Sequence, residues 1–248
     1  MHFLDRAEAG RVLVRALEHL RGQRDLIVLA LPRGGVPVAY EIARALAVPL
    51  DVFVVRKLGV PGQEELAMGC SSVPSASRNE PVAERAISAV ASGGVRVLNE
   101  EVVEALGERA PAAIEEATRR ETEELRRREE RYRGAHAFPD LAGKTVLLVD
   151  DGLATGATMR AAARAVRQRQ PARLIVAVPV AAQSTCREME TEADEVICAL
   201  IPETFFGVGQ FYENFDQTSD EEVRTLLTGA ASEREIKPPN EKNFPISL

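Results

Sequence analysis

Two adjacent carboxylates followed by a short turn of small and hydroxyl-bearing residues are the part of this sequence best suited to chemistry. Asp150 and Asp151 end the apolar run VLLV, and residues 152–158 (GLATGAT) lead into a helical pattern. Free backbone N–H groups at a helix start, with the hydroxyls of Thr155 and Thr158, can surround a phosphate without any lysine. Because the carboxylates would repel that phosphate, we expect them to face hydroxyls or a hydrated metal ion. The stretch therefore predicts a site for a phosphorylated sugar.

The alternative interpretation of this turn is helix capping alone. Capping needs one side chain that bears an oxygen, whereas this turn has two aspartates and two threonines. Gly156 also lets the backbone approach an anion closely. The pattern therefore favours ligand binding over simple capping.

Two further loops place positive charge at the ends of predicted strands. Arg33 precedes Gly34 and Gly35, and a charged group with bare amides at a helix start suits a pyrophosphate. Arg56 and Lys57 end the next strand. Each loop taken alone has an ordinary alternative, a plain strand-to-helix connection or a solvated strand end. Together with the Asp-Asp turn, they supply the charge that a diphosphate ligand requires.

Strands and helices alternate along most of the chain. Strands are predicted over 26–31, 51–56, 145–150, 173–180 and 194–200, and helices over 5–21, 34–47, 157–169 and near 183–191. This alternation predicts an α/β fold with a mostly parallel sheet and helices on both faces. Ligands bind beyond the carboxyl ends of the strands in such sheets, which is where all three loops fall.

Three segments depart from that rhythm. Residues 59–98 are rich in Gly, Pro and Ser and predict loops and a hairpin, with 93–99 as one of its strands. Residues 108–133 carry eight acidic and eight basic residues, which predicts a solvated helix with intrahelical ion pairs; a lid or partner-binding helix is the alternative. Residues 230–248 are polar and aperiodic, so we predict a flexible tail, or an arm that clasps a neighbouring subunit.

The stretch DDGLATGAT resembles the signature of the type I phosphoribosyltransferases. The resemblance covers residues 26–200 by strand order, and 3–228 with the flanking segments. It implies a three-layer α/β/α fold with a small hood and an extended lid and helical insertion. The implied organisation is one domain over 1–229, with its core at 26–200, the lid and charged helix at 59–138 and the hood at 201–228.

The resemblance also implies a reaction. Ribose 5-phosphate would pass from phosphoribosyl pyrophosphate to a nitrogenous base or related small acceptor, with release of pyrophosphate and Mg²⁺ as the cofactor. The family's 5-phosphate loop matches Ala154, Thr155, Gly156, Ala157 and Thr158. Its ribose-facing carboxylates match Asp150 and Asp151, which would reach Mg²⁺ only through water, so that the ligand holds the ion without a direct protein ligand. Its pyrophosphate loop matches Arg33, Gly34 and Gly35, and Arg56 and Lys57 are similar to a basic pair in adenine phosphoribosyltransferases.

Departures from the family pattern leave the acceptor open. The hypoxanthine-guanine branch has an Asp, often proposed as an acid/base, where this chain has Ala154. Glu65 lies where a mobile loop would bring a carboxylate over the site, and an exposed loop charge is the alternative. The segment 203–215 is distantly similar to the aromatic hood of that branch, which would make Phe205 or Phe206 the residue stacking on a base; packing against the sheet is the alternative.

Composition excludes several other classes. A formal net charge of −7 argues against a nucleic-acid binder. The three cysteines form no CxxC pair, so we expect neither a disulfide framework nor a zinc site, and a reducing, cytoplasmic location. No apolar run is long enough for a membrane helix, and a homodimer is expected as the family's common arrangement. The main alternative function is a regulator that binds phosphoribosyl pyrophosphate without transfer; a phosphoribosyl pyrophosphate synthase, which needs an ATP site, ranks last.

Overall fold

The computed structural model describes residues 2–58, 88–98, 110–134 and 136–236 of the 248-residue chain.

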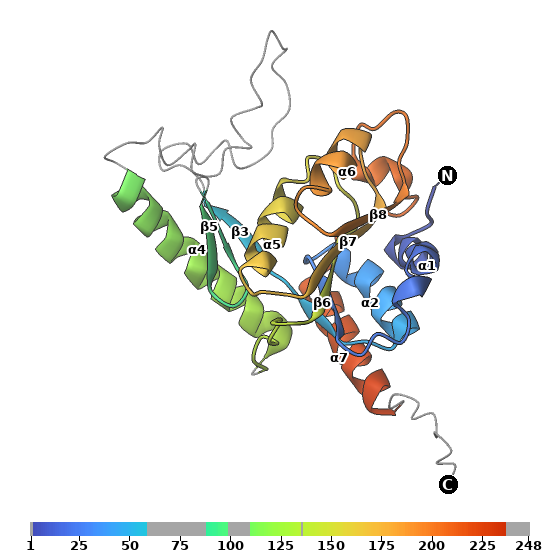
Figure 1. The fold of residues 1–248 in the computed structure, drawn as a ribbon, viewed down its shortest axis with the longest axis horizontal. Coiled ribbons are helices and arrows are strands. Elements are labelled where there is room, and N and C mark those ends of the chain that lie inside the picture. The colour runs from blue at the N-terminus through green and yellow to red at the C-terminus, as the bar shows by residue number, and fades with distance from the viewer. Residues whose placement is uncertain (1, 59–87, 99–109, 135, 237–248) are drawn as a thin grey trace.

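The centre of the fold is a five-stranded parallel sheet in the order β2-β1-β6-β7-β8 (Figure 1). The strands are Leu50–Val52 (β2), Leu26–Ala30 (β1), Thr145–Val149 (β6), Arg173–Val180 (β7) and Glu195–Leu200 (β8). Ala30 at the end of β1 lies in register with Val149 at the end of β6. The loops that follow β1 and β6 therefore leave the sheet side by side.

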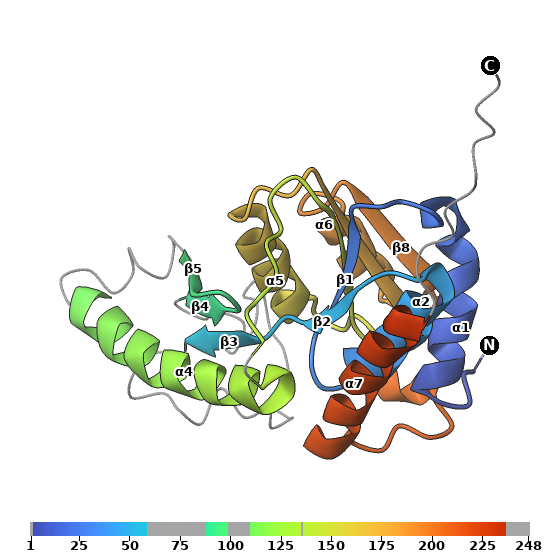
Figure 2. The ribbon, with the colours of Figure 1, turned by 90° about the horizontal axis from the view of Figure 1, so that it is seen from below.

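Helices cover both faces of this sheet (Figures 1 and 2). The α-helices of the described residues are Arg6–Ala16 (α1), Gly35–Leu46 (α2), Ala110–Arg133 (α4), Ala157–Arg167 (α5), Gln183–Met189 (α6) and Asp220–Ile236 (α7). Among them, α4 lies along a second sheet (Figure 2). Along β6, Leu147 and Val149 pack with residues of α1 and α2, whereas Val146 and Leu148 pack with residues of α5 and α6. Successive strand residues point to opposite faces, so this strand, which is buried from Val146 to Val149, supports both helical layers. The predicted three-layer α/β/α fold is confirmed.

A second, smaller sheet is antiparallel and contains Val55–Leu58 (β3), Ser88–Ala91 (β4) and Val95–Leu98 (β5). It includes the predicted hairpin, with β5 inside the range expected for a strand. The single strand predicted over 51–56 is wrong, because the chain leaves the central sheet after β2 and enters the small sheet at β3. Phe53 and Val54, which connect the two, are both buried. The apolar run is therefore continuous and does not mark the change of sheet.

Helix α4 lies along the small sheet (Figure 2). Ala117, Leu125 and Tyr132 form a buried stripe on it. The prediction of a solvated helix is therefore wrong for this face. Intrahelical ion pairs are present as predicted; in one of them, Nε of Arg128 lies 2.9 Å from Oε1 of Glu124.

Helix α7 overlaps the predicted tail. The helix continues to Ile236, so the prediction of a tail from residue 230 is wrong for 230–236, and residues 237–248 lie outside the described part of the chain. Val223 and Ala230, seven residues apart, are buried on the side that faces α2 and α4. These few apolar residues are surrounded by charged ones, so the composition of the segment suggested a tail.

A disulfide joins Cys186 of α6 to Cys198 of β8. The expectation that the cysteines form no disulfide framework did not foresee this bond, while Cys70 lies outside the described residues. The two cysteines have no CxxC spacing because α6 and β8 bring together residues twelve positions apart. Within the described residues, no helix is both long and apolar enough to cross a membrane.

Candidate functional site

The two carboxylates follow β6 directly, at the carboxyl end of the central sheet. The backbone N–H of Asp151 donates to Oδ1 of Asp150 at 2.9 Å, and Nε of Arg6 donates to Oδ2 of Asp151 at 2.8 Å. Burial raises the pKa of both aspartates, and the charge of Asp151 raises the pKa of Asp150 further. One guanidinium against two carboxylates leaves the pair short of positive charge.

The loop after β1 packs directly against these carboxylates. A Cβ atom at Gly34 would overlap the carboxylate of Asp151, and one at Gly35 would lie 2.6 Å from the carbonyl oxygen of Val149. Only glycine allows this approach. The peptide bond between Pro32 and Arg33 is cis. The structure therefore brings together the Arg33-Gly34-Gly35 loop and the Asp-Asp pair, which sequence analysis had placed at two strand ends.

The turn from 152 to 158 is braced from α6. Thr185 donates from Oγ1 to the carbonyl oxygen of Ala154 at 2.7 Å. Gly156 has a φ of +71° at the N-cap of α5, and a Cβ there would lie 2.6 Å from Cγ2 of Thr185. Thr155 and Thr158 are exposed. The turn thus presents its hydroxyls outward at a helix start while its backbone is held from behind.

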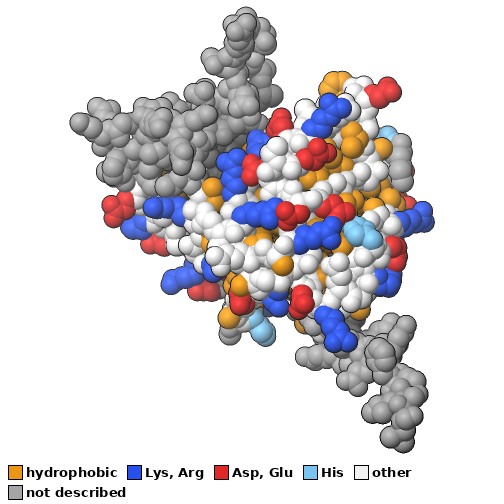
Figure 3. Space-filling model, in the orientation of Figure 1, with side chains coloured by type: hydrophobic (Ala, Val, Ile, Leu, Met, Phe, Trp, Pro, Cys, Tyr) orange, Lys and Arg blue, Asp and Glu red, His pale blue; other side chains and the backbone are white. Residues whose placement is uncertain are grey.

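Arg160 is a second brace that the sequence analysis missed. Its guanidinium donates to the carbonyl oxygen of Thr155 at 2.9 Å and pairs with Glu188 of α6 at 3.0 Å. Acidic and basic side chains are interspersed over the face of the molecule in Figure 3. Arg164 of α5 likewise pairs with Glu192, which follows α6, at 2.5 Å. The sequence signal that could have indicated this brace is an arginine four residues after Gly156, one helical turn into α5.

Residues from the hood close the other side of Asp151. The hydroxyl of Tyr212 donates to the carbonyl oxygen of Asp151 at 2.6 Å, and burial, helped by the charge of Asp151, raises the pKa of Tyr212. The guanidinium of Arg6 lies 4.0 Å from the ring centroid of Phe215. Neither Arg6 nor Tyr212 belongs to a local motif, so no sequence pattern placed either of them at this site.

The two candidate stacking residues have different surroundings. Phe205 stacks on Phe211 with ring centroids 5.7 Å apart, and both belong with Phe3 to an apolar cluster at the sheet edge. Phe206 is 90% exposed. Packing thus accounts for Phe205, while Phe206 keeps a free ring.

The other basic pair and the loop glutamate are not brought to the carboxylates by any described contact. Arg56 pairs with Glu121 of α4 at 2.7 Å. Lys57 pairs with Ala89 through the β3 and β4 backbones, and its side chain lies outside the described residues. Glu65 also lies outside them. Among the residues that are described, no group of three or more His, Cys, Asp or Glu side chains is placed to hold a metal ion.

The family model described as "Phosphoribosyl transferase domain" matches residues 5–216. The chain belongs to the phosphoribosyl transferase family. This match falls within the 3–228 range over which the sequence resembles the type I phosphoribosyltransferases, and that identification is confirmed.

Named relatives agree with this family. Two Mycobacterium tuberculosis proteins, "Putative phosphoribosyl transferase MT0597" (strain CDC 1551 / Oshkosh) and "Putative phosphoribosyl transferase Rv0571c" (strain ATCC 25618 / H37Rv), are each 44% identical to this phosphoribosyl transferase chain over 228 residues. The match covers 92% of this chain and 47% of theirs, so the chain spans about half the length of these relatives. The crystal structure of TT1426 from Thermus thermophilus has a TM-score of 0.75 and 39% identity, covering 92% of this chain and 99% of that one.

Proposed function

We propose that this protein transfers ribose 5-phosphate from phosphoribosyl pyrophosphate to a nitrogenous base or related small acceptor and releases pyrophosphate. Family membership supports a transferase of this class. The observation that carries the proposal is the contact of the Gly34 backbone with the carboxylate of Asp151. This contact places the loop of Arg33, Gly34 and Gly35 beside the Asp150-Asp151 pair, which the turn at 154–158 follows directly in the chain.

Each part of the donor then has a complementary part of the protein. The turn of Ala154, Thr155, Gly156, Ala157 and Thr158 would bind the 5-phosphate through backbone N–H groups and hydroxyls. Asp150 and Asp151 would accept hydrogen bonds from the ribose hydroxyls. Arg33, Gly34 and Gly35 would bind the pyrophosphate, with Arg56 and Lys57 as further candidates from β3.

The residues at the carboxylate pair fit a Mg²⁺ ion bound with the donor. Asp150 and Asp151 have raised pKa values because they are partly desolvated, and Arg6 offsets only one of their charges. Oxygen ligands and bound water are what Mg²⁺ prefers. When bound, the ion supplies positive charge to the pyrophosphate leaving group.

The chain's own contribution to the reaction is orientation and charge. Asp150 and Asp151 hold the ribose so that its C1 faces the acceptor, and Arg33 stabilises the negative charge that develops on pyrophosphate as the bond at C1 breaks. Lys57 is a further candidate for that charge. Because Ala154 has no titratable group, proton transfer to or from the acceptor requires another residue, for which Glu65 is the candidate.

The acceptor side of the site is assigned to the hood. Phe206 has the exposed ring, which supports it over Phe205 as the side chain that stacks on a planar acceptor. A homodimer and a cytoplasmic location are part of the same proposal.

The test is calorimetry of the full chain with phosphoribosyl pyrophosphate and Mg²⁺, followed by a pyrophosphate-release screen over purines, pyrimidines and related heterocycles. Binding with release for one acceptor supports the proposal and names the substrate. Binding without release favours the non-catalytic regulator, and no binding contradicts both. The double variant Asp150→Asn, Asp151→Asn should lose transfer, whereas Asp25→Asn, an exposed carboxylate away from the site, should keep it.

A further inference from the structure

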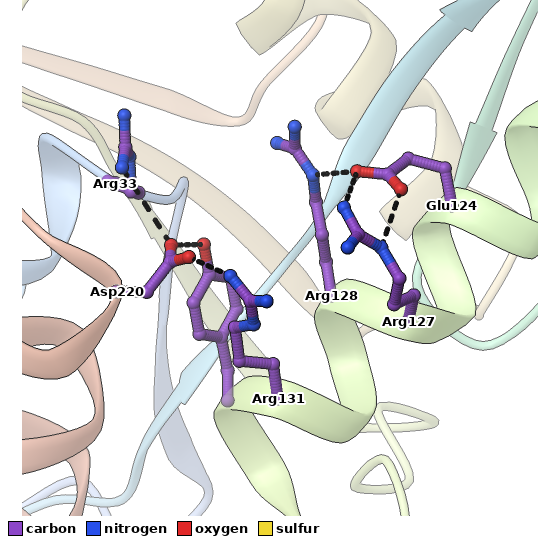
Figure 4. A pocket seen from close by; sticks show the side chains of 7 residues that line it. Arg33, Glu124, Arg127, Arg128, Arg131 and Asp220 are labelled. Carbon is purple, nitrogen blue, oxygen red and sulfur yellow. Dashed lines mark hydrogen bonds and ion pairs between the residues drawn. The ribbon is translucent and has the colours of Figure 1, made fainter.

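A basic cavity of about 150 Å³ lies between α4, the start of α7 and the loop that carries Arg33 (Figure 4). It is lined by Arg33, Glu124, Arg127, Arg128, Arg131, Tyr132 and Asp220. Four guanidiniums face two carboxylates there, so the lining has an excess of positive charge in a chain whose formal net charge is −7. Such a cavity is suited to an anion.

The sequence of α4 builds one wall of this cavity. Glu124, Arg127, Arg128 and Arg131 follow one another at intervals that place them on one helical face. Arg126 belongs to the opposite face, where its side chain is 77% exposed. The arginines of the cavity and Arg126 therefore lie on different faces of the helix, although Arg127 is itself 64% exposed.

The carboxylate on α4 is fully engaged by two of these arginines. Glu124 accepts hydrogen bonds from Nε of Arg127 at 2.8 Å and Nε of Arg128 at 2.9 Å. These bonds lower the pKa of Glu124 to about 2, so it stays ionised near neutral pH. A guanidinium has five N–H donors. Glu124 accepts from only some of the donors of Arg127 and Arg128, so other donors remain for a ligand.

The carboxylate on α7 is engaged in the same manner. Asp220 accepts a hydrogen bond from the hydroxyl of Tyr132 at 2.7 Å and another from Arg131. Arg33 lies farther away, with 3.8 Å between its Nη1 and Oδ1 of Asp220. The Arg33 guanidinium is thus the least tightly held of those around this carboxylate.

Figure 4 shows the Arg33 and Arg128 side chains extending in the same direction from opposite walls of the cavity. Both are partly exposed, at 32% and 38% of their side-chain surface. A ligand arriving from solvent therefore meets two guanidiniums at once. Planar guanidinium forks match the oxygen geometry of phosphate better than a point charge does.

We propose that this cavity is a binding site for a phosphate-bearing anion, held by Arg127 and Arg128 from α4 and by Arg33 from the opposite wall. The site shares Arg33 with the pyrophosphate loop. If its ligand is the sugar donor, this inference rests on the proposed function and deepens it; if its ligand is a separate phosphorylated molecule, the site goes beyond that function. A pyrophosphate group is the chemistry recognised. It can belong to the sugar donor or to a separate phosphorylated molecule.

The competing explanation is a brace that only fastens α4 to α7. In a brace between α4 and α7, the arginines of α4 would bind the carboxylate of α7. Asp220 of α7 is already bound by Tyr132 and Arg131, so the brace does not require the other arginines. Arg127 and Arg128 reach only Glu124, on their own helix, among the contacts of the described residues. They therefore do not fasten α4 to another element.

The first experiment is calorimetry of the full chain with inorganic pyrophosphate as the probe. The double variant Arg127→Gln, Arg128→Gln should weaken pyrophosphate binding by about tenfold or more, the scale for losing charge-assisted hydrogen bonds. Arg126→Gln, from the solvent face of the same helix, should bind like the wild type. Equal binding by the double variant and the wild type, or no binding by the wild type, would overturn the proposal.

A competition arm distinguishes the two sources of the anion. If phosphoribosyl pyrophosphate displaces the probe, the cavity serves the donor's pyrophosphate; if the donor-saturated chain still binds one equivalent, the ligand is a separate phosphorylated molecule. Either result supports the site, provided that the double variant Arg127→Gln, Arg128→Gln weakens the binding that is observed. Thr155→Val tests the proposed function separately, since it should weaken the donor and leave pyrophosphate binding unchanged.

A second measurement does not depend on the variants folding. In the wild-type chain, pyrophosphate should protect Arg127 and Arg128 from modification by phenylglyoxal, while Arg126 stays reactive. Peptide mass spectrometry reads the three positions separately. Equal labelling of Arg127 and Arg128 with and without pyrophosphate would contradict the proposal.

Discussion

The Nε atom of Arg6 donates a 2.8 Å hydrogen bond to Oδ2 of Asp151, across 145 residues of sequence. Both side chains are largely buried, with 12% and 15% of their surfaces exposed. A second donor of Arg6 bonds the carbonyl oxygen of Asp216 in the hood at 2.7 Å. Arg6 therefore ties the first helix, the carboxylate pair and the hood into one unit.

Replacing Arg6 should therefore affect both stability and the site. We expect Arg6→Gln to lower the free energy of unfolding by about 1 to 3 kcal/mol, because it leaves a partly buried carboxylate without its charged partner. Loss of the guanidinium should also raise the pKa of Asp151, moving the acidic limb of the pH profile for donor binding to higher pH. Urea unfolding and calorimetry across pH measure the two effects. Arg15→Gln, an exposed position on the same helix, is the control and should change neither.

Asp150 should limit the stability of the protein at neutral pH. Its pKa is raised above the ordinary 3.8 by burial and by Asp151, so the folded state binds the proton more tightly than the unfolded state. Stability is then lost as pH rises from about the ordinary aspartate value through the raised folded value. We expect Asp150→Asn to increase the free energy of unfolding at pH 7 by about 1 kcal/mol while abolishing transfer. A lower unfolding midpoint for Asp150→Asn than for Asp25→Asn would contradict this.

Gly34 should tolerate no side chain. An alanine Cβ there would overlap the Asp151 carboxylate, so Gly34→Ala should lower stability by about 1 to 3 kcal/mol, as overpacking does, and weaken donor binding. Gly207 provides the matched control, because a Cβ there meets no atom within 4 Å. Thermal unfolding and donor titration of the two variants give the comparison, and equal behaviour would show that the loop can move away from Asp151.

Thr185 should control the 5-phosphate-type turn without touching the ligand. Thr185→Val keeps the methyl group against Gly156 and removes the hydrogen bond to Ala154, so we expect a loss of about 1 kcal/mol in stability and weaker donor binding. Thr191→Val is the control, because its hydroxyl bonds the carbonyl oxygen of Glu188 near the end of α6. Donor affinity should separate the two variants, and indistinguishable affinities would mean that the turn is rigid without its brace.

The disulfide between Cys186 and Cys198 should contribute to stability. Closing a loop of this size is worth about 3 kcal/mol in the chain-entropy account, so reduction should lower the unfolding midpoint by a corresponding amount. Alkylation followed by mass spectrometry before and after reduction tests whether the bond forms. Cys70→Ser is the control and should leave the bond in place; free thiols at Cys186 and Cys198 in the unreduced chain would contradict the prediction.

Local patterns predicted much of the fold. Apolar periodicity correctly placed strands β1, β6, β7 and β8 of the central sheet and helices α1, α2, α5 and α6. Buried strands and amphipathic helices leave such signals within a few consecutive residues. The exceptions have a physical cause. The run through Phe53 and Val54 is buried throughout, so hydrophobicity does not mark where the chain passes from one sheet to the other.

In the candidate site too, local patterns predicted some features and missed others. The sequence alone determined the family, the α/β fold, the Asp150-Asp151 pair and the turn that follows it, since these depend on neighbouring residues. Only the tertiary structure decided that Arg6 pairs with Asp151, that Cys186 meets Cys198, and that the arginines of α4 face Arg33 across a cavity. A guanidinium pairs equally well with any carboxylate within reach, so its partner depends on which distant segments the packing of the core brings together.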